Sequence, residues 1–274
     1  MSHGFSQIRT DYCFRFALVL CLSCANLCKS VDKEKTMSET ERYFPGKRGV
    51  LCLTFDDRNL QYWLAALPIF RKYGAKASFF ITGKIDEEAL KVIAALKADG
   101  HTVGLHTMNH ADAPVYFEKN GAQAYLDNEV LPQYNACAAA GYKVKAFAYP
   151  NNRRNEDTDR VLSAYFTHFR AGLGVARPEG ISLADFEPLY KPVAELSGRT
   201  VMGGAGIGTY YNTVLEDNLA VLRKAHDAEQ VVVFFSHDIS ATPSRIGTSN
   251  AVLEAMLKTA NELGMAIVGF DELP

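Results

Sequence analysis

The stretch Gly49-Val50-Leu51-Cys52-Leu53-Thr54-Phe55-Asp56-Asp57 decides the fold, because a run of apolar and β-prone residues ends abruptly in two adjacent carboxylates. An apolar run without alternation is typical of a parallel strand that is covered on both faces. In parallel α/β folds the chemistry gathers at the carboxyl ends of such strands, where Asp56 and Asp57 would lie. Two like charges at the rim of an apolar core are costly unless a metal, a base or water compensates them. The alternative interpretation is an Asp-Asp turn that caps the following helix, since Asp is a common N-cap.

Strand and helix patterns alternate from this stretch to the end of the chain. The predicted strands are 77–81, 101–105, 144–149, 168–173, 231–235 and 265–268. The predicted helices are 60–73, 86–98, 116–140, 157–166, 215–228 and 250–263. Pro68 predicts a break or kink in the first of these helices, and Pro132 predicts an interruption of the third. Sustained alternation without an internal repeat predicts one parallel α/β domain. Periodicity alone leaves open whether the sheet closes into a barrel.

The segment 174–216 is the least regular part of the chain and contains the glycine cluster 203–208. The cluster lacks the GxGxxG spacing and the βαβ context of a nucleotide-binding loop. It therefore favours a flexible loop.

The composition is that of a nearly neutral globular protein: 274 residues, 48% hydrophobic and 22% charged, with a formal net charge of -2. A chain of this length can bury a substantial core as one domain. No basic run is interleaved with aromatic residues, so nothing indicates a nucleic-acid partner. Cys52 and Cys137 are interpreted as small core residues. The domain contains no CxxC pair, so the sequence does not indicate a cysteine zinc site.

The first thirty residues have the charged, apolar and small-residue parts of a secretory signal. Arg9 and Arg15 precede the apolar run 16–22, which is too short to span a bilayer stably. Cys24 resembles the acceptor of a bacterial lipoprotein signal and hence a possible lipid anchor, although Cys21 stands where Leu is usual. A plain cleaved signal or a mis-assigned start are the alternatives. We expect a signal over 1–28, a polar tether over 29–46, the domain over 47–274, and an exported protein that is periplasmic, at the cell surface or secreted.

Polar groups recur where the predicted strands end, namely at Asp56-Asp57, His106 and His110, Tyr149-Pro150-Asn151, and His237. In a parallel sheet these ends share one face, so the groups could converge on a single site. Two neutral imidazoles and one carboxylate form a set of three ligands that leaves positions open for water and substrate, as catalytic zinc requires. A His-x-x-x-His pair can also arise by chance in a chain with seven histidines.

Four segments resemble the successive motifs of the polysaccharide deacetylases, the NodB-homology family (carbohydrate esterase family 4). They are Thr54-Phe55-Asp56-Asp57, His106-Thr107-Met108-Asn109-His110, Phe147-Ala148-Tyr149-Pro150 and Phe235-Ser236-His237. The similarity runs from about Gly49 to the carboxyl terminus. It implies an α/β fold, a distorted (β/α)7 barrel that is TIM-like and forms a single catalytic domain.

The resemblance also implies an activity: a metal-dependent hydrolase that removes N-acetyl groups from an N-acetylated polysaccharide and releases acetate, acting on carbon–nitrogen bonds other than peptide bonds. The metal would be divalent, usually Zn2+, with Co2+ or another ion as an alternative. Position by position, the resemblance assigns the metal to Asp57, His106 and His110, the general base to Asp56, the general acid to His237, and the oxyanion contact to the backbone N–H of Asn151.

The chain departs from the family pattern at three places. Ala148 stands where many members have an Arg that orients the base. The string Phe-Ala-Tyr-Pro instead resembles the branch of the family that deacetylates poly-N-acetylglucosamine. Asn151-Asn152 replaces an aromatic-glycine pair, and the only Trp, Trp63, lies outside the fourth motif. The candidates to replace the missing Arg are Arg153, Arg154 and Arg170. The alternative functions are a non-catalytic glycan-binding barrel and a deacetylase of O-acetylated glycans or of a non-sugar amide.

Overall fold

The computed structural model describes residues 38–196 and 200–274. The predicted signal over 1–28, with Cys24, lies outside the described residues. Residues 39–274 form one compact unit that begins with helix α2 (Glu39–Tyr43), earlier than the boundary expected at 47. Helix α2 is attached to the unit through Thr40, which is buried and whose hydroxyl donates to the carbonyl of Glu229 at 2.9 Å. Across the described ranges, the helices are too short or too polar to cross a membrane.

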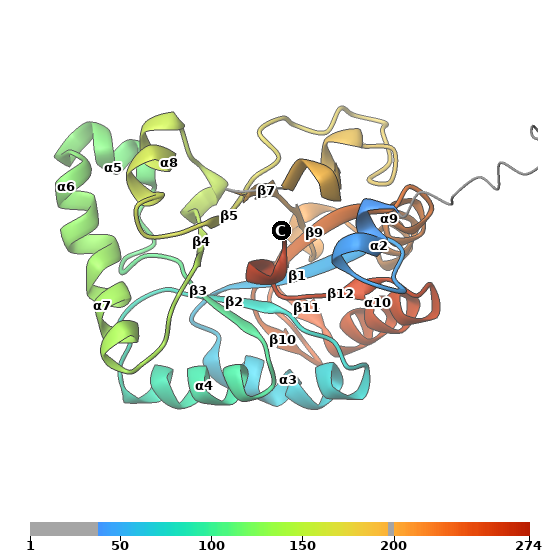
Figure 1. Ribbon diagram of the computed structural model, residues 1–274, viewed down its shortest axis with the longest axis horizontal. Helices are drawn as coiled ribbons and strands as arrows, with labels where there is room; N and C mark the ends of the chain where they lie inside the picture. Colours follow the sequence, from blue (N-terminus) through green and yellow to red (C-terminus); the bar gives the residue numbers. More distant parts are fainter. Residues whose placement is uncertain (1–37, 197–199) are drawn as a thin grey trace, which may run out of the picture. The chain divides into compact units, whose positions relative to one another are not determined.

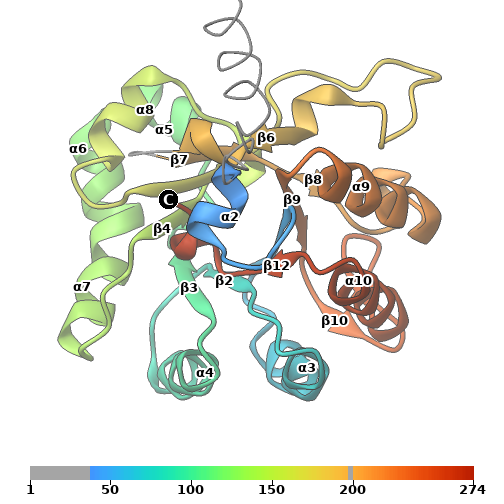
Figure 2. The ribbon, with the colours of Figure 1, turned by 45° about the vertical axis from the view of Figure 1, so that its right-hand side comes forward.

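A parallel sheet curls into a barrel at the centre of this unit (Figures 1 and 2). Its neighbouring strands are, in order, β9 (Gln230–Ser236), β1 (Val50–Asp57), β2 (Ser78–Ile81), β3 (Thr102–Leu105), β4 (Ala146–Ala148), β5 (His168–Ala171) and β7 (Thr200–Gly203). Strand β8 (Ala205–Gly206) follows β7 after one residue and pairs with β9 in parallel. One bent strand, β7–β8, therefore connects β5 to β9 and closes the ring.

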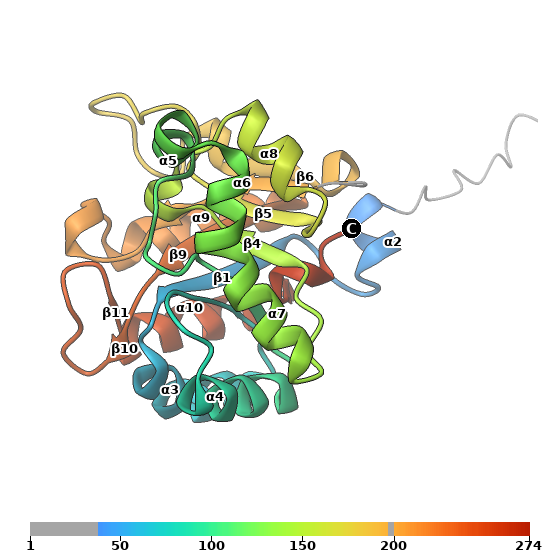
Figure 3. The ribbon, with the colours of Figure 1, turned by 90° about the vertical axis from the view of Figure 1, so that its left-hand side faces the viewer.

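Shorter strands complete the pairing. They are β6 (Tyr190–Pro192), antiparallel to β9, β12 (Ala266–Ile267), parallel to β1, and the separate pair β10 (Ile239–Ser240) and β11 (Thr248–Ser249). The loop between β10 and β11 and helix α2 lie at opposite ends of the barrel (Figure 3).

The glycine cluster 203–208 was predicted to be a flexible loop, but residues 203–206 of it belong to the bent strand β7–β8. A Cβ atom on Gly203 would lie 2.7 Å from the Leu173 Cα, and one on Gly204 would lie 3.2 Å from Val233 Cγ1. Glycine is used here because neighbouring strands approach closely where the strand bends. The loop prediction was wrong because glycine marks both flexible loops and such close contacts.

Helices surround the barrel (Figure 2). They are α3 (Leu60–Lys72), α4 (Glu87–Ala98), α5 (Ala113–Asn120), α6 (Ala122–Tyr125), a π-helical turn (Leu126–Val130), α7 (Leu131–Ala139), α8 (Glu156–Leu162), α9 (Leu215–Asp227) and α10 (Asn250–Glu262). Asp86 caps α4, since its side chain accepts a hydrogen bond from the Ala89 N–H. Of the break or kink predicted at Pro68, the break is wrong, because α3 continues through this residue. Short 3₁₀ helices occupy Pro150–Asn152, Glu187–Leu189, Val193–Leu196, Thr209–Tyr211 and Phe270–Glu272.

The strands separate two apolar cores. Because successive strand side chains point to opposite faces, Val50 and Cys52 of β1 face the barrel interior, whereas Leu51, Leu53 and Phe55 pack beneath the surrounding helices. Burial on both faces explains why the strand is apolar without alternation. The structure confirms the (β/α)7 barrel that the sequence motifs implied.

Candidate active site

Alternation along the strands directs polar side chains into the carboxyl end of the barrel. On β1 the inward row that starts with Val50 and Cys52 ends at Asp56, and on β9 the row of Val231 and Val233 ends at His237. His106 and Arg170 end the corresponding rows of β3 and β5. The predicted convergence of strand ends therefore occurs, because parallel strands share one carboxyl rim.

Asp57, His106 and His110 bring three potential ligand atoms together. The Nε2 atoms of His106 and His110 each lie 3.8 Å from Oδ1 of Asp57, and all three ligand atoms lie within 4.8 Å of one another. Nδ1 of His106 lies 2.8 Å from the carbonyl oxygen of Ala148. A carbonyl can only accept, so Nδ1 carries the hydrogen and Nε2 presents its lone pair to the cluster.

The protonation state of His106 also suits a metal ligand. Burial lowers the pKa of His106 to about 4, although the charge of Asp56 opposes this effect. The imidazole is therefore neutral near pH 7, the form that binds a metal. Two imidazole nitrogens and one carboxylate oxygen match the donors that zinc prefers, so these residues fit a divalent ion.

Left-handed backbone marks the turns that carry the ligands. The φ angles are 77° at Asp57, 69° at Thr107 and 53° at His110. Such values are uncommon for residues other than glycine and often occur at functional sites. The turn before His110 is held by Glu129, a buried residue of the π-helical turn, which accepts hydrogen bonds of 2.8 Å from both the backbone N–H and the side-chain amide of Asn109. Sequence reasoning missed Glu129.

Asp56, the predicted base, is paired with Arg170. Nη2 of Arg170 donates to Oδ2 of Asp56, and Nη1 donates to the side-chain oxygen of Asn152. Burial by itself would raise the pKa of Asp56, but the Arg170 guanidinium, together with the histidines nearby, holds that pKa below its usual value. The second oxygen, Oδ1, is buried and has no hydrogen-bond partner among the described residues. Asp56 is therefore charged and has one oxygen available to accept a proton.

The other two arginine candidates point elsewhere. Arg153 forms an ion pair with Asp112 at 3.1 Å, and Arg154 forms one with Asp159 at 2.7 Å. Arg170 alone of the three reaches Asp56. The sequence placed Arg170 within a predicted strand, 168–173, but did not distinguish it from the other two candidates.

His237, the predicted acid, points its Nε2 atom toward the same cluster. Nε2 lies 3.7 Å from Oδ2 of Asp57, and Nδ1 lies 3.1 Å from the backbone carbonyl oxygen of Ile246. The Nδ1–H therefore donates to Ile246 and fixes the ring. The indole N–H of Trp63 donates to the backbone carbonyl of His237 at 3.0 Å. The only Trp of the chain thus contacts the backbone of His237, and the group that orients the His237 ring is a carbonyl.

Asn151, the predicted oxyanion residue, lies on the short helix that follows β4 at the same rim. Asn151 and Asn152 have φ angles of 55° and 59°, and Asn152 contacts Arg170. Tyr149 does not contribute its hydroxyl to the cluster, because that hydroxyl donates to Asp159 at 2.7 Å. The oxyanion role of the Asn151 N–H stays a prediction.

The barrel has the fold of solved carbohydrate deacetylase structures. A crystal structure of a polysaccharide deacetylase from Bacillus cereus is similar, with a TM-score of 0.52 and 23% identity over 81% of this chain and 92% of that chain. Residues 45–167 match the family model of polysaccharide deacetylases, and this region belongs to that family.

Two named relatives share part of the chain. A peptidoglycan-N-acetylglucosamine deacetylase of Bacillus cereus is 35% identical over 88 residues, which are 32% of this chain and 32% of the relative. A chitin deacetylase of Arthroderma benhamiae is 43% identical over 68 residues, which are 23% of this chain and 18% of the relative. The chain therefore spans a third or less of the length of these two relatives.

Proposed function

We propose that this protein is a metal-dependent hydrolase that removes N-acetyl groups from an N-acetylated polysaccharide and releases acetate. The observation that carries the proposal is the meeting of three ligand atoms, from Asp57, His106 and His110, with a free oxygen of Asp56 and Nε2 of His237 at one rim. Membership of the polysaccharide deacetylase family supports the reaction class. The relatives named as peptidoglycan and chitin deacetylases support an N-acetylated glycan as substrate.

Asp57, His106 and His110 would hold the ion, with zinc favoured by the donor set and cobalt as an alternative. A bound divalent ion lowers the pKa of water and polarises an acetamide carbonyl. Oδ1 of Asp56 accepts the proton of the attacking water, because Arg170 keeps this carboxylate charged. The ion pair also fixes the orientation of the carboxylate.

His237 gives a proton from Nε2 to the leaving amine, while its Nδ1–H stays bound to the carbonyl of Ile246. The backbone N–H of Asn151 would donate to the oxyanion that forms on the acetyl carbonyl oxygen. The products are acetate and an amino sugar. The signal pattern over 1–28 supports a further proposal, that the protein is exported, with Cys24 as a possible lipid anchor.

Acetate release from chitooligosaccharides, peptidoglycan and acetylated xylan, each with added zinc or cobalt, tests the proposal. We expect release from at least one N-acetylated glycan. Release from acetylated xylan alone would change the substrate to an O-acetyl ester. Saccharide binding without any product would contradict the proposal and indicate a glycan-binding barrel.

A further inference from the structure

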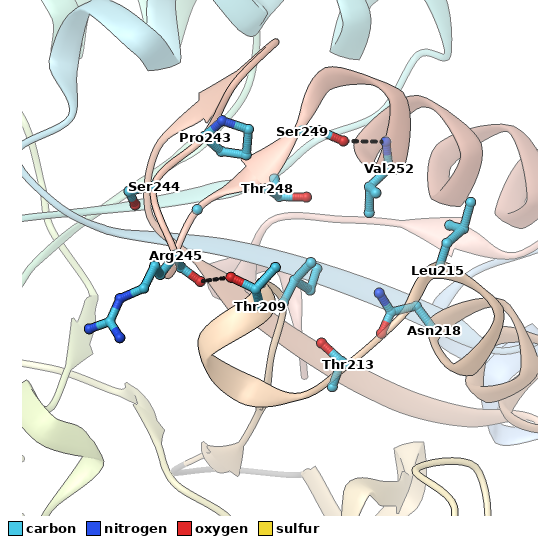
Figure 4. A pocket seen from close by; sticks show the side chains of 13 residues that line it. Thr209, Thr213, Leu215, Asn218, Pro243, Ser244, Arg245, Thr248, Ser249 and Val252 are labelled. Atoms are coloured by element: carbon cyan, nitrogen blue, oxygen red, sulfur yellow. Dashed lines mark hydrogen bonds between the residues drawn. The ribbon is translucent and has the colours of Figure 1, made fainter.

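A cavity lies at the same end of the barrel as the candidate active site, outside the cluster of candidate metal ligands. It has a volume of about 350 Å³ and lies between the first turns of α9 and α10 and the β10–β11 loop (Figure 4). We call it the α9/α10 cavity. None of the proposed metal ligands is among the described residues that line it. Its volume is within the range of about 300–1,000 Å³ that is typical of small-ligand sites.

Two buried polar atoms at this cavity have no partner. The side chains of Asn218 and Thr248 line the cavity, and these residues are 1% and 2% exposed. Oδ1 of Asn218 and Oγ1 of Thr248 make no hydrogen bond within the described part of the chain. Such a group costs about 1–3 kcal/mol when it is left unsatisfied. In Figure 4 the Thr248 hydroxyl points toward the side of the cavity on which Val252 and Leu215 lie.

The neighbouring hydroxyl groups differ, because they are used by the fold itself. The Thr213 hydroxyl donates to the carbonyl of Gly206 at 3.1 Å, and the Ser249 hydroxyl accepts from the Val252 N–H at 3.1 Å as the cap of α10. Asn218 and Thr248 are therefore the side chains with unused polar atoms on this wall.

The lining indicates a neutral ligand. Oδ1 of Asn218 can only accept, so it requires an O–H or N–H donor and disfavours an anion. Arg245 is the charged residue of the described lining, and its guanidinium lies 5.4 Å over the exposed ring of Tyr210 and points away from the cavity in Figure 4. The aliphatic side chains of Ile207 and Val252 complete a wall that combines apolar and polar groups, which suits the apolar face and hydroxyl edge of a sugar ring.

The cavity is adjacent to the residue that orients His237. Arg245 and Gly247 line the cavity, and Ile246 between them accepts the Nδ1–H of His237. We propose that the α9/α10 cavity binds one neutral sugar ring of the glycan, other than the ring at the metal site, through hydrogen bonds to Asn218 and Thr248. This inference rests on the function proposed above, because that function supplies the glycan.

Calorimetric titration of the full chain with N-acetylglucosamine tests the inference. Thr248→Val removes the hydroxyl at nearly constant shape, and we expect it to weaken the affinity for the sugar about three- to tenfold. We expect the same loss of affinity from Asn218→Leu. Thr259→Val is the matched control, because Thr259 lies on α10, the helix that follows β11, but does not line the cavity. Equal affinity of Thr248→Val and the control, or no binding to the unmodified protein, would overturn the inference.

Two further measurements separate the possible failures. Thr248→Val should unfold at the same or a higher urea concentration than the unmodified protein without sugar, so weaker binding cannot be attributed to misfolding. Acetate release by the unmodified protein is measured in parallel. If acetate is released but Thr248→Val binds the sugar normally, the cavity assignment fails and the deacetylase function stands. If binding depends on Thr248 but no glycan is deacetylated, the deacetylase function fails.

Discussion

Arg170 and Asp56 form a buried ion pair across the barrel, between β5 and β1. The pair is 1% and 3% exposed. Position 148 on β4, where many family members have an Arg, holds Ala148, so the guanidinium that pairs with Asp56, the proposed base, comes from the adjacent strand. A buried carboxylate needs such a partner to remain charged. The missing Arg of the third motif is therefore no argument against catalysis.

Replacing Arg170 should change the pH dependence of activity. In Arg170→Met we expect the pKa of Asp56 to rise, because its counter-charge is lost, so the acid limb of kcat/KM against pH moves to higher pH. The same variant should also be less stable, because breaking a buried pair costs about 3–5 kcal/mol of unfolding free energy. In the unmodified protein the pKa of Asp56 is lower in the folded than in the unfolded state. Asp56 therefore contributes stability that is present above its unfolded pKa and is lost as pH falls through the folded pKa. Arg153→Met is the control, and an unchanged acid limb would refute the role.

Asp56→Asn separates the base from the metal ligands. We expect bound metal to remain and turnover to fall by about 10² to 10⁴, because the amide cannot accept the proton. Metal content by elemental analysis and acetate release measure the two effects. Full activity of Asp56→Asn would show that another group is the base.

His237→Ala should affect substrates according to their leaving group. An amine departs poorly without a proton, so acetamide hydrolysis should slow by about 10² or more, whereas 4-nitrophenyl acetate should be affected less. The ratio of the two rates is the readout, and His226→Ala, on α9, is the control. Equal slowing of both substrates would argue against an acid role.

Glu129→Leu should weaken metal binding without removing a ligand. The two hydrogen bonds from Asn109 to Glu129 hold the turn before His110, and loss of comparable supporting contacts costs about 10- to 100-fold in metal affinity. Competition with a chromophoric chelator measures this affinity. Exposed Glu118→Leu is the matched control. An affinity equal to that of the control would mean that the turn holds its shape without Glu129.

The strand ends could be predicted from sequence because their signal is local. The apolar runs before Asp56 and His237 identify buried strands, and the shared rim of a parallel sheet then brings their polar ends together. Arg170 was only one of three candidates, because its choice requires the geometry between β5 and β1, which no local pattern contains. The same applies to Glu129, whose carboxylate meets Asn109 only in the folded chain. It applies also to the Ile246 carbonyl, since a backbone acceptor has no signature in the sequence.

The glycine cluster shows a different limit. Gly203 and Gly204 fit either a mobile loop or a strand in close contact, and only the neighbouring Leu173 and Val233 distinguish the two. Glycine patterns are therefore informative about close packing only when the contacts are known.

Anomalous diffraction at the zinc absorption edge, on crystals of the protein with zinc, tests the central claim most directly. The account predicts one peak about 2.0–2.2 Å from a carboxylate oxygen of Asp57 and from Nε2 of His106 and His110, with Asp56 next to it but bound to Arg170. Asp57→Ala should lose this peak. A fully loaded protein whose zinc lies away from these three residues would contradict the account.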